Sequence, residues 1–89
     1  MQIDQNTIND MNKCASYHNE EITLVGYVNI RRGKFDVKCN NFGIGRTYAE
    51  ALENLRRRCS RTDDMSDIVS VDVHTVYIGD TFYMGTITE

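Results

Sequence analysis

The chain has 89 residues, of which 40% are hydrophobic and 26% charged, and it contains no proline. This length fits a single domain, residues 1–89, and the composition excludes a disordered or low-complexity chain. Its apolar runs are too short to span a bilayer, and no basic start followed by an apolar segment marks a signal peptide, so we expect a cytoplasmic protein without membrane contact.

The formal net charge of −3 conceals an uneven distribution. Residues 31–61 carry nine of the ten basic residues and three acidic ones, a local charge of +6. Residues 62–89 carry six acidic residues and no basic one. The middle block is therefore the part of the chain that would bind an acidic partner.

The first predicted element is a helix over residues 7–18, where apolar residues recur at helical spacing. Thr7, with Asp10 three residues later, is its expected cap. Residues 21–30 then alternate as a strand does, and Gly33 turns the chain into a second strand over residues 34–40.

A short third strand over residues 42–44 is expected after Asn40 and Asn41. Thr47 and Glu50 then form a capping box, which predicts the start of a second helix. Tyr48, Ala51, Leu52, Leu55 and Cys59 make its buried stripe, and three arginines in its last turn complement the helix dipole.

Residues 68–78 and 81–88 predict a final hairpin, turned by Gly79 and Asp80. In this register Tyr77 faces Phe82, Thr75 faces Met84 and Val73 faces Thr86. The inward set would then continue from Val69 and Val71. The whole pattern predicts an α+β fold: an antiparallel sheet of four to five strands with two helices on one face, in the order α-β-β-β-α-β-β.

Basic residues of the middle block are the first candidate site, for a partner protein or for nucleic acid. An alternative stays open, in which the helix-end arginines only stabilise the helix dipole and pair with Glu53. The candidate residues are Arg31, Arg32, Lys34, Arg46, Arg56, Arg57, Arg58 and Arg61.

The final hairpin is the second candidate site, because its face opposite the predicted core is also apolar. Val76, Ile78, Tyr83 and Ile87 would form an uncovered protein interface there, which Val25 and Tyr27 could extend. The last strand lacks the lysine or proline that discourages strand addition, so a homodimer through this ribbon is the simplest assembly.

No catalytic signature stands out, and we expect neither enzymatic activity nor a cofactor or metal. The glycines of GIG, residues 43–45, favour close packing over phosphate binding, because the lysine and further glycine of a phosphate-binding loop are missing. Cys14, Cys39 and Cys59 have no CxxC or zinc-ligand spacing, which favours buried reduced thiols.

Residues 7–60 resemble the double-stranded-RNA-binding domain in element order and in KFDVKC, GIG and TYAEAL. Where that family has a lysine cluster at the helix start, this chain has Tyr48, Ala49 and Glu50. The same stretch is similar to the strand-then-GxTxxEAL element of HicB-type antitoxins. The first resemblance implies RNA binding, and the second implies an antitoxin.

Small size, the absence of catalytic residues and an asymmetric surface favour a non-catalytic binding protein. We expect it to inhibit or regulate a macromolecular partner, as compact viral inhibitors of host defence and antitoxins do. The arginine-rich face and the apolar hairpin would make the contact. The alternative is an RNA-binding module that uses the same arginines.

Overall fold

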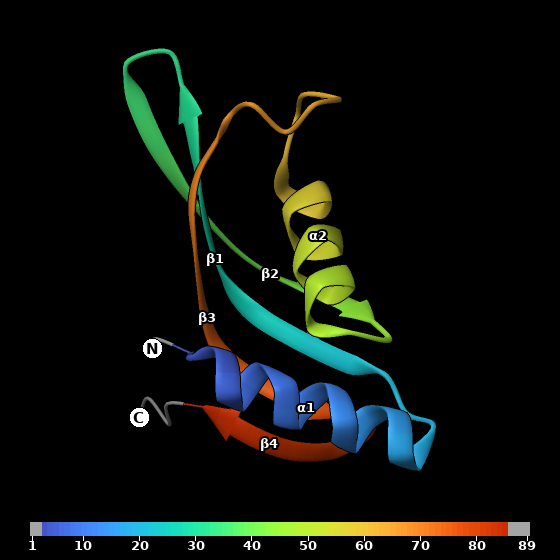
Figure 1. Ribbon diagram of the computed structural model, residues 1–89. Helices are drawn as coiled ribbons and strands as arrows, with labels where there is room; N and C mark the ends of the chain where they lie inside the picture. The colour runs from blue at the N-terminus through green and yellow to red at the C-terminus, as the bar shows by residue number, and fades with distance from the viewer. Residues whose placement is uncertain (1–2, 86–89) are drawn as a thin grey trace.

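The fold consists of a four-stranded antiparallel sheet with two helices packed on one face of the sheet (Figure 1). The computed structural model describes residues 3–85. Along the chain the elements are α1 (Gln5–His18), β1 (Ile22–Arg32), β2 (Phe35–Gly45), α2 (Tyr48–Cys59), β3 (Ile68–Ile78) and β4 (Thr81–Gly85). The sheet order is β2-β1-β3-β4, which confirms the predicted α+β class.

The predicted order of elements is wrong at one point, because β2 is one continuous strand. It pairs with β1 along its whole length, from Phe35 opposite Arg32 to Gly45 opposite Ile22. β1 is equally long, so the two asparagines do not interrupt the pairing. The Asn41 side chain instead accepts a hydrogen bond from the Phe42 N–H at 2.9 Å. The order is therefore α-β-β-α-β-β.

Each helix begins at a side chain that accepts a backbone hydrogen bond. Thr47 caps α2 as predicted, and its hydroxyl oxygen accepts from the Glu50 N–H at 3.2 Å. The cap of α1 is Asp4 rather than Thr7, since the Asp4 carboxylate accepts from the Thr7 N–H at 2.8 Å. This bond lowers the pKa of Asp4. The first helix therefore starts earlier than its apolar spacing alone predicts.

The second helix rests directly on the backbone of β2 at two glycines. A Cβ atom on Gly43 would overlap the backbone of Ala51 and Leu55. A Cβ atom on Gly45 would lie 2.5 Å from the Ala51 nitrogen. The GIG motif thus permits close helix–strand packing, as the sequence predicts.

The core lies between the helices and the sheet, and it draws residues from both helices and from two strands. Leu55, predicted as a core residue, is fully buried, while Leu52 is half-buried against the core. The buried hydrophobic residues are Met11, Ala15, Ile22, Leu24, Val28, Ile30, Ala51, Leu55, Cys59, Val73, Val76 and Ile78.

A β-bulge in β3 changes which residues face this core. Val73 and Val76 are both buried, so the alternation of the strand shifts between them. The pairing with β1 shifts at the same place, which leaves His74 as an extra residue. The prediction that the inward set continues through Thr75 and Tyr77 is therefore wrong. A single inserted residue sends every later side chain to the opposite face.

Both predicted hairpin turns are present. Gly33 and Gly79 have φ angles of 60° and 59°, a conformation that side-chain-bearing residues rarely adopt. Beyond the second turn, Tyr77 lies opposite Phe82, as predicted.

A second irregularity changes the rest of that hairpin. The register shifts between Val76 and Tyr77, so Met84 lies opposite Val76 and not opposite Thr75. Tyr83 is the extra residue on β4. The pairing predicted for Thr86 lies outside the described residues.

Candidate binding surface on the open face of the sheet

The face of the sheet opposite the helices carries four exposed aromatic rings, one from each strand. These residues, here called the ring patch, are Tyr27, Phe42, Tyr77 and Phe82, and they are between 37% and 51% exposed. Both helices pack against the other face, so no helix within residues 3–85 covers them. A cluster of exposed aromatic side chains on one face is typical of a binding surface.

Strand register places Tyr77 and Phe82 in one row, Phe42 in the next row opposite Val25, and Tyr27 in the row after that, opposite Asn40 and Asp72. Ile44, Thr23 and Tyr77 lie side by side across β2, β1 and β3, and Phe82 follows on β4. Tyr77 and Phe82 meet edge to face, with 5.9 Å between ring centroids. This end of the open face is therefore mostly apolar from one edge of the sheet to the other, with Thr23 as its one polar side chain.

Two cations are held over rings of the patch. The Arg58 guanidinium carbon lies 4.3 Å from the Phe42 ring centroid, and its Nε–H donates to the Phe42 carbonyl oxygen at 3.0 Å. The Lys38 ammonium lies 5.3 Å from the Tyr27 centroid. Since the Arg58 bond uses Nε–H, its two terminal amino groups are left for a partner.

His74 sits in the middle of the open face because the bulge places it there. Its ring lies 5.0 Å from the Tyr27 ring, tilted by 48°. Its Nε2 lies 3.1 Å from the Asn40 side-chain oxygen, and its Nδ1 lies 2.8 Å from the Thr75 hydroxyl. These contacts fix the orientations of both His74 and Tyr27, so this part of the face is preorganised.

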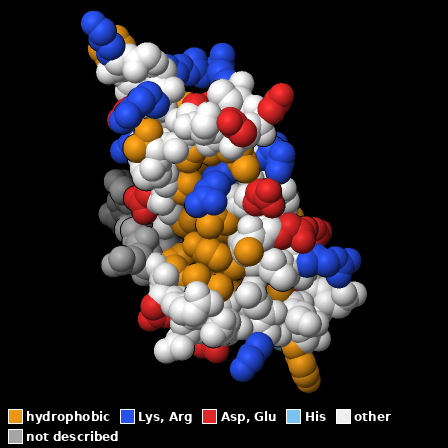
Figure 2. All heavy atoms as spheres, turned by 45° about the horizontal axis from the view of Figure 1, so that its top comes forward, with side chains coloured by type: hydrophobic (Ala, Val, Ile, Leu, Met, Phe, Trp, Pro, Cys, Tyr) orange, Lys and Arg blue, Asp and Glu red, His pale blue; other side chains and the backbone are white. Residues whose placement is uncertain are grey.

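The β1–β2 hairpin extends past the helices as an arm (Figure 1). All residues from 31 to 38 are exposed, including Arg31, Arg32 and Lys34. Phe35, beside the turn, is 74% exposed. Figure 2 shows Lys and Arg side chains gathered at this end of the molecule. The Arg31 Nε–H donates to Asp36 at 3.2 Å, so part of this positive charge is neutralised locally.

The arginines that end α2 have different surroundings. Arg56 is exposed. Arg57 pairs with Glu53 at 2.9 Å, which is the i,i+4 pairing expected if these arginines only stabilise the helix. Arg57 and Arg58 line a hollow of about 340 Å³ together with Ile44 and Asn54. Only Arg58 thus joins the helix end to the ring patch.

The predicted basic residues do not form one continuous face. Arg46 lies at the opposite end of α2, where it donates to the Asn19 side chain at 3.4 Å. The loop after α2 places an acidic side chain beside the basic residues at the end of this helix. The Asp67 carboxylate accepts from the Ser60 hydroxyl at 2.6 Å and from the Arg61 N–H at 2.9 Å. These bonds lower the pKa of Asp67, so it carries a negative charge among the arginines.

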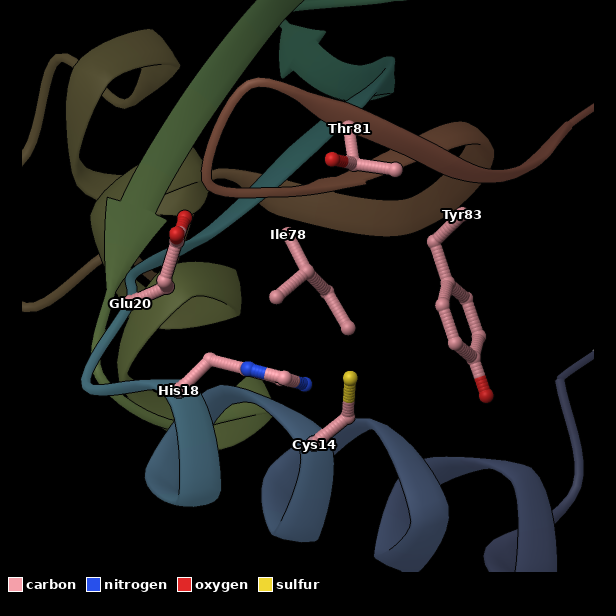
Figure 3. A pocket seen from close by; sticks show the side chains of 6 residues that line it. All are labelled: Cys14, His18, Glu20, Ile78, Thr81 and Tyr83. Carbon is pink, nitrogen blue, oxygen red and sulfur yellow. The ribbon is translucent and has the colours of Figure 1, made fainter.

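The apolar hairpin face predicted as an interface is covered by α1. Val76 is fully buried and Ile78 nearly so, which contradicts their expected exposure. Tyr83 lines a hollow of about 210 Å³ between α1 and the hairpin, which Cys14 and His18 also line (Figure 3). Ile87 lies outside the described residues. The bulge at His74 explains why Val76 and Ile78 are buried, because it turns these two side chains inward and Tyr77 outward.

Sequence reasoning noted Tyr27 on the outward side of its strand but missed the rest of the ring patch. The alternation of apolar and polar residues assigns Tyr77 and Phe82 to the core. No residue type within β3 itself marks the bulge. In β2, Lys38 and Phe42 alternate with residues that face the core. This alternation was the one signal in the sequence that these two side chains face outward.

No protein-family model, curated protein or solved structure matches the chain. The resemblances to the double-stranded-RNA-binding domain and to HicB-type antitoxins therefore stay predictions. Within residues 3–85, no helix is long and apolar enough to cross a membrane. No group of three or more His, Cys, Asp or Glu side chains in the same part of the chain is placed to hold a metal ion.

Proposed function

We propose that the protein is a small non-catalytic binding protein that inhibits or regulates a partner protein by occupying it. The contact surface is the open face of the sheet, with the ring patch at its centre. The observation that carries this proposal is the exposure of four aromatic rings on a face that neither helix covers.

The composition of this face favours a protein partner. Aromatic residues and arginine are enriched where protein interfaces have their strongest contacts, and lysine is depleted there. The ring patch combines Tyr and Phe side chains with Arg58, whose position is already fixed by Phe42. Little side-chain entropy would be lost when these groups bind, which increases affinity.

The test is a binding assay with paired variants. Tyr77→Ser with Phe82→Ser should weaken binding to the captured and purified partner protein by at least ~30-fold, the effect of losing a contact worth about 2 kcal/mol. Phe35→Ser removes an even more exposed ring outside the patch and serves as the control. If both variants fold and bind equally well, the open face is not the contact surface.

RNA is a second candidate partner, supported by the two cation–ring pairs. Single-stranded nucleic acid stacks its bases on exposed aromatic side chains, and arginine and lysine beside them contact phosphates. Arg58 over Phe42 and Lys38 over Tyr27 provide such an arrangement. The basic arm could contact further phosphates along the strand.

Nuclease treatment and salt distinguish the two candidates. A protein partner stays bound in a pull-down after nuclease digestion, whereas an RNA-mediated complex is lost. Affinity for a labelled single-stranded RNA should also fall steeply as salt increases, since counterions are released from each contacted phosphate. An affinity that does not change with salt would exclude the RNA candidate.

A further inference from the structure

Two of the three cysteines meet where α2 ends above β2. Cys59 is the last residue of α2, and Cys39 lies in β2 on the side of the core, opposite Val28. The Cys59 thiol donates to the Cys39 sulfur, with 3.1 Å between the two sulfur atoms. Cys14 lies on α1 and lines the separate hollow beneath the final hairpin. The sequence gives no sign of this pairing, because the two residues are 20 positions apart.

The surroundings of the pair already hold it in place. α2 rests on the backbone of β2 at Gly43, and the Arg58 side chain bonds the Phe42 carbonyl beside it. A disulfide needs its sulfur atoms about 2 Å apart. The thiols are therefore about one further ångström from bonding distance, an approach that side-chain rotation can supply.

We propose that Cys39 and Cys59 are a modification site, at which a reversible disulfide fastens the end of α2 to β2. The oxidant is a low-molecular-weight disulfide of the glutathione class. In the first step the Cys39 thiolate attacks one sulfur of this oxidant, forming a mixed disulfide and expelling one thiolate.

In the second step the Cys59 sulfur attacks the Cys39 sulfur and expels the second thiolate. The protein loses two electrons and two protons, and the oxidant gains both to become two free thiols. No metal or other co-reactant is needed. Reduction by an excess of the same small thiol reverses both steps.

The two thiols have different roles because their exposure differs. Cys39 is half-buried and can be reached from solvent, whereas Cys59 is buried. Burial, and secondarily the hydrogen bond with Cys39, raises the pKa of Cys59 to about 12. Cys59 is therefore protonated at neutral pH, and ring closure is the slow step. Its rate should increase as the pH rises from 7 to 9, because the thiolate is the nucleophile.

The experiment treats the purified full chain with excess oxidised glutathione and follows it by mass spectrometry under denaturing conditions. The expected product has lost the two thiol hydrogens and carries a single free thiol, which alkylation and peptide mapping assign to Cys14. Closing this loop should raise the melting temperature by roughly 10–20 °C, and a reductant should reverse the increase.

Single-cysteine variants provide the controls. Cys14→Ser should form the same crosslink, while Cys39→Ser and Cys59→Ala should not form it and should show no increase in melting temperature. The proposal is overturned if folded Cys14→Ser protein keeps both thiols free. It is equally overturned if the reaction stops at a glutathione adduct on Cys39 at pH 9, since the sulfurs would then be unable to meet.

Discussion

Replacing Gly43 by alanine tests how closely α2 approaches β2. The new Cβ atom would lie 2.8 Å from the Leu55 Cα and would overlap the backbone nitrogen of Leu55 and the carbonyl oxygen of Ala51. Carbon atoms in contact are normally about 3.5–4.0 Å apart, so the helix must move away by roughly 1 Å. All three obstructing atoms belong to the backbone, and no side-chain rotation can relieve the overlap.

This displacement would loosen the fully buried contacts of Ala51 and Leu55 with the sheet. Overpacking of a core costs about 1–3 kcal/mol, and we expect Gly43→Ala to lose about 3 kcal/mol of unfolding free energy. For a domain of this size, that corresponds to a fall in melting temperature of roughly 12–24 °C.

Chemical denaturation monitored by circular dichroism measures the loss. Gly33→Asn is the matched control, because a Cβ at Gly33 meets no atom within 4 Å and asparagine tolerates its positive φ angle. We expect this control to stay within ~0.5 kcal/mol of the unmodified protein. A Gly43→Ala protein as stable as this control would show that the helix does not rest on the strand backbone.

Two further predictions concern the core and the acidic loop. Val76→Lys should abolish folding, since an unpaired buried charge costs several kcal/mol, whereas Tyr77→Lys should fold. Circular dichroism measures both outcomes. The reverse result would mean that β3 alternates without a bulge. Asp67→Asn should destabilise the protein at pH 7. The pKa of Asp67 is lowered in the folded state, so its contribution is present above the unfolded pKa of about 3.9 and is lost as pH falls through the folded pKa. Urea denaturation should therefore separate the two proteins more at pH 7 than at pH 2, and an equal difference at both pH values would contradict this origin.

Local signals were sufficient to predict most of the fold. The Thr47–Glu50 capping box and the glycines at positions 33 and 79 each determine their structure through neighbouring residues alone. The same holds for the stripe of α2, in which Leu55 is fully buried. Each of these features depends on hydrogen bonds or backbone angles within a few residues.

Features that depend on a second element could not be predicted in the same way. β2 runs on through Asn41 because β1 offers a pairing partner beyond it. The bulge at His74 arises where β3 crosses Gly26, whose missing Cβ leaves room for the Asp72 carbonyl. Tyr77 joins the ring patch because of that bulge, so an error of one residue placed Tyr77 in the core and Val76 and Ile78 on the open face.

The contacts between α2 and the outer strand also bear on aggregation. β2 is an edge strand, and the carbonyl oxygens of Phe42 and Ile44 are already bonded by Arg58 at 3.0 Å and by Asn54 at 2.7 Å. The Phe42 N–H is bonded by Asn41. A foreign strand that tried to extend the sheet here would find these groups occupied. Side chains of a neighbouring helix thus oppose the addition of a foreign strand at Phe42 and Ile44.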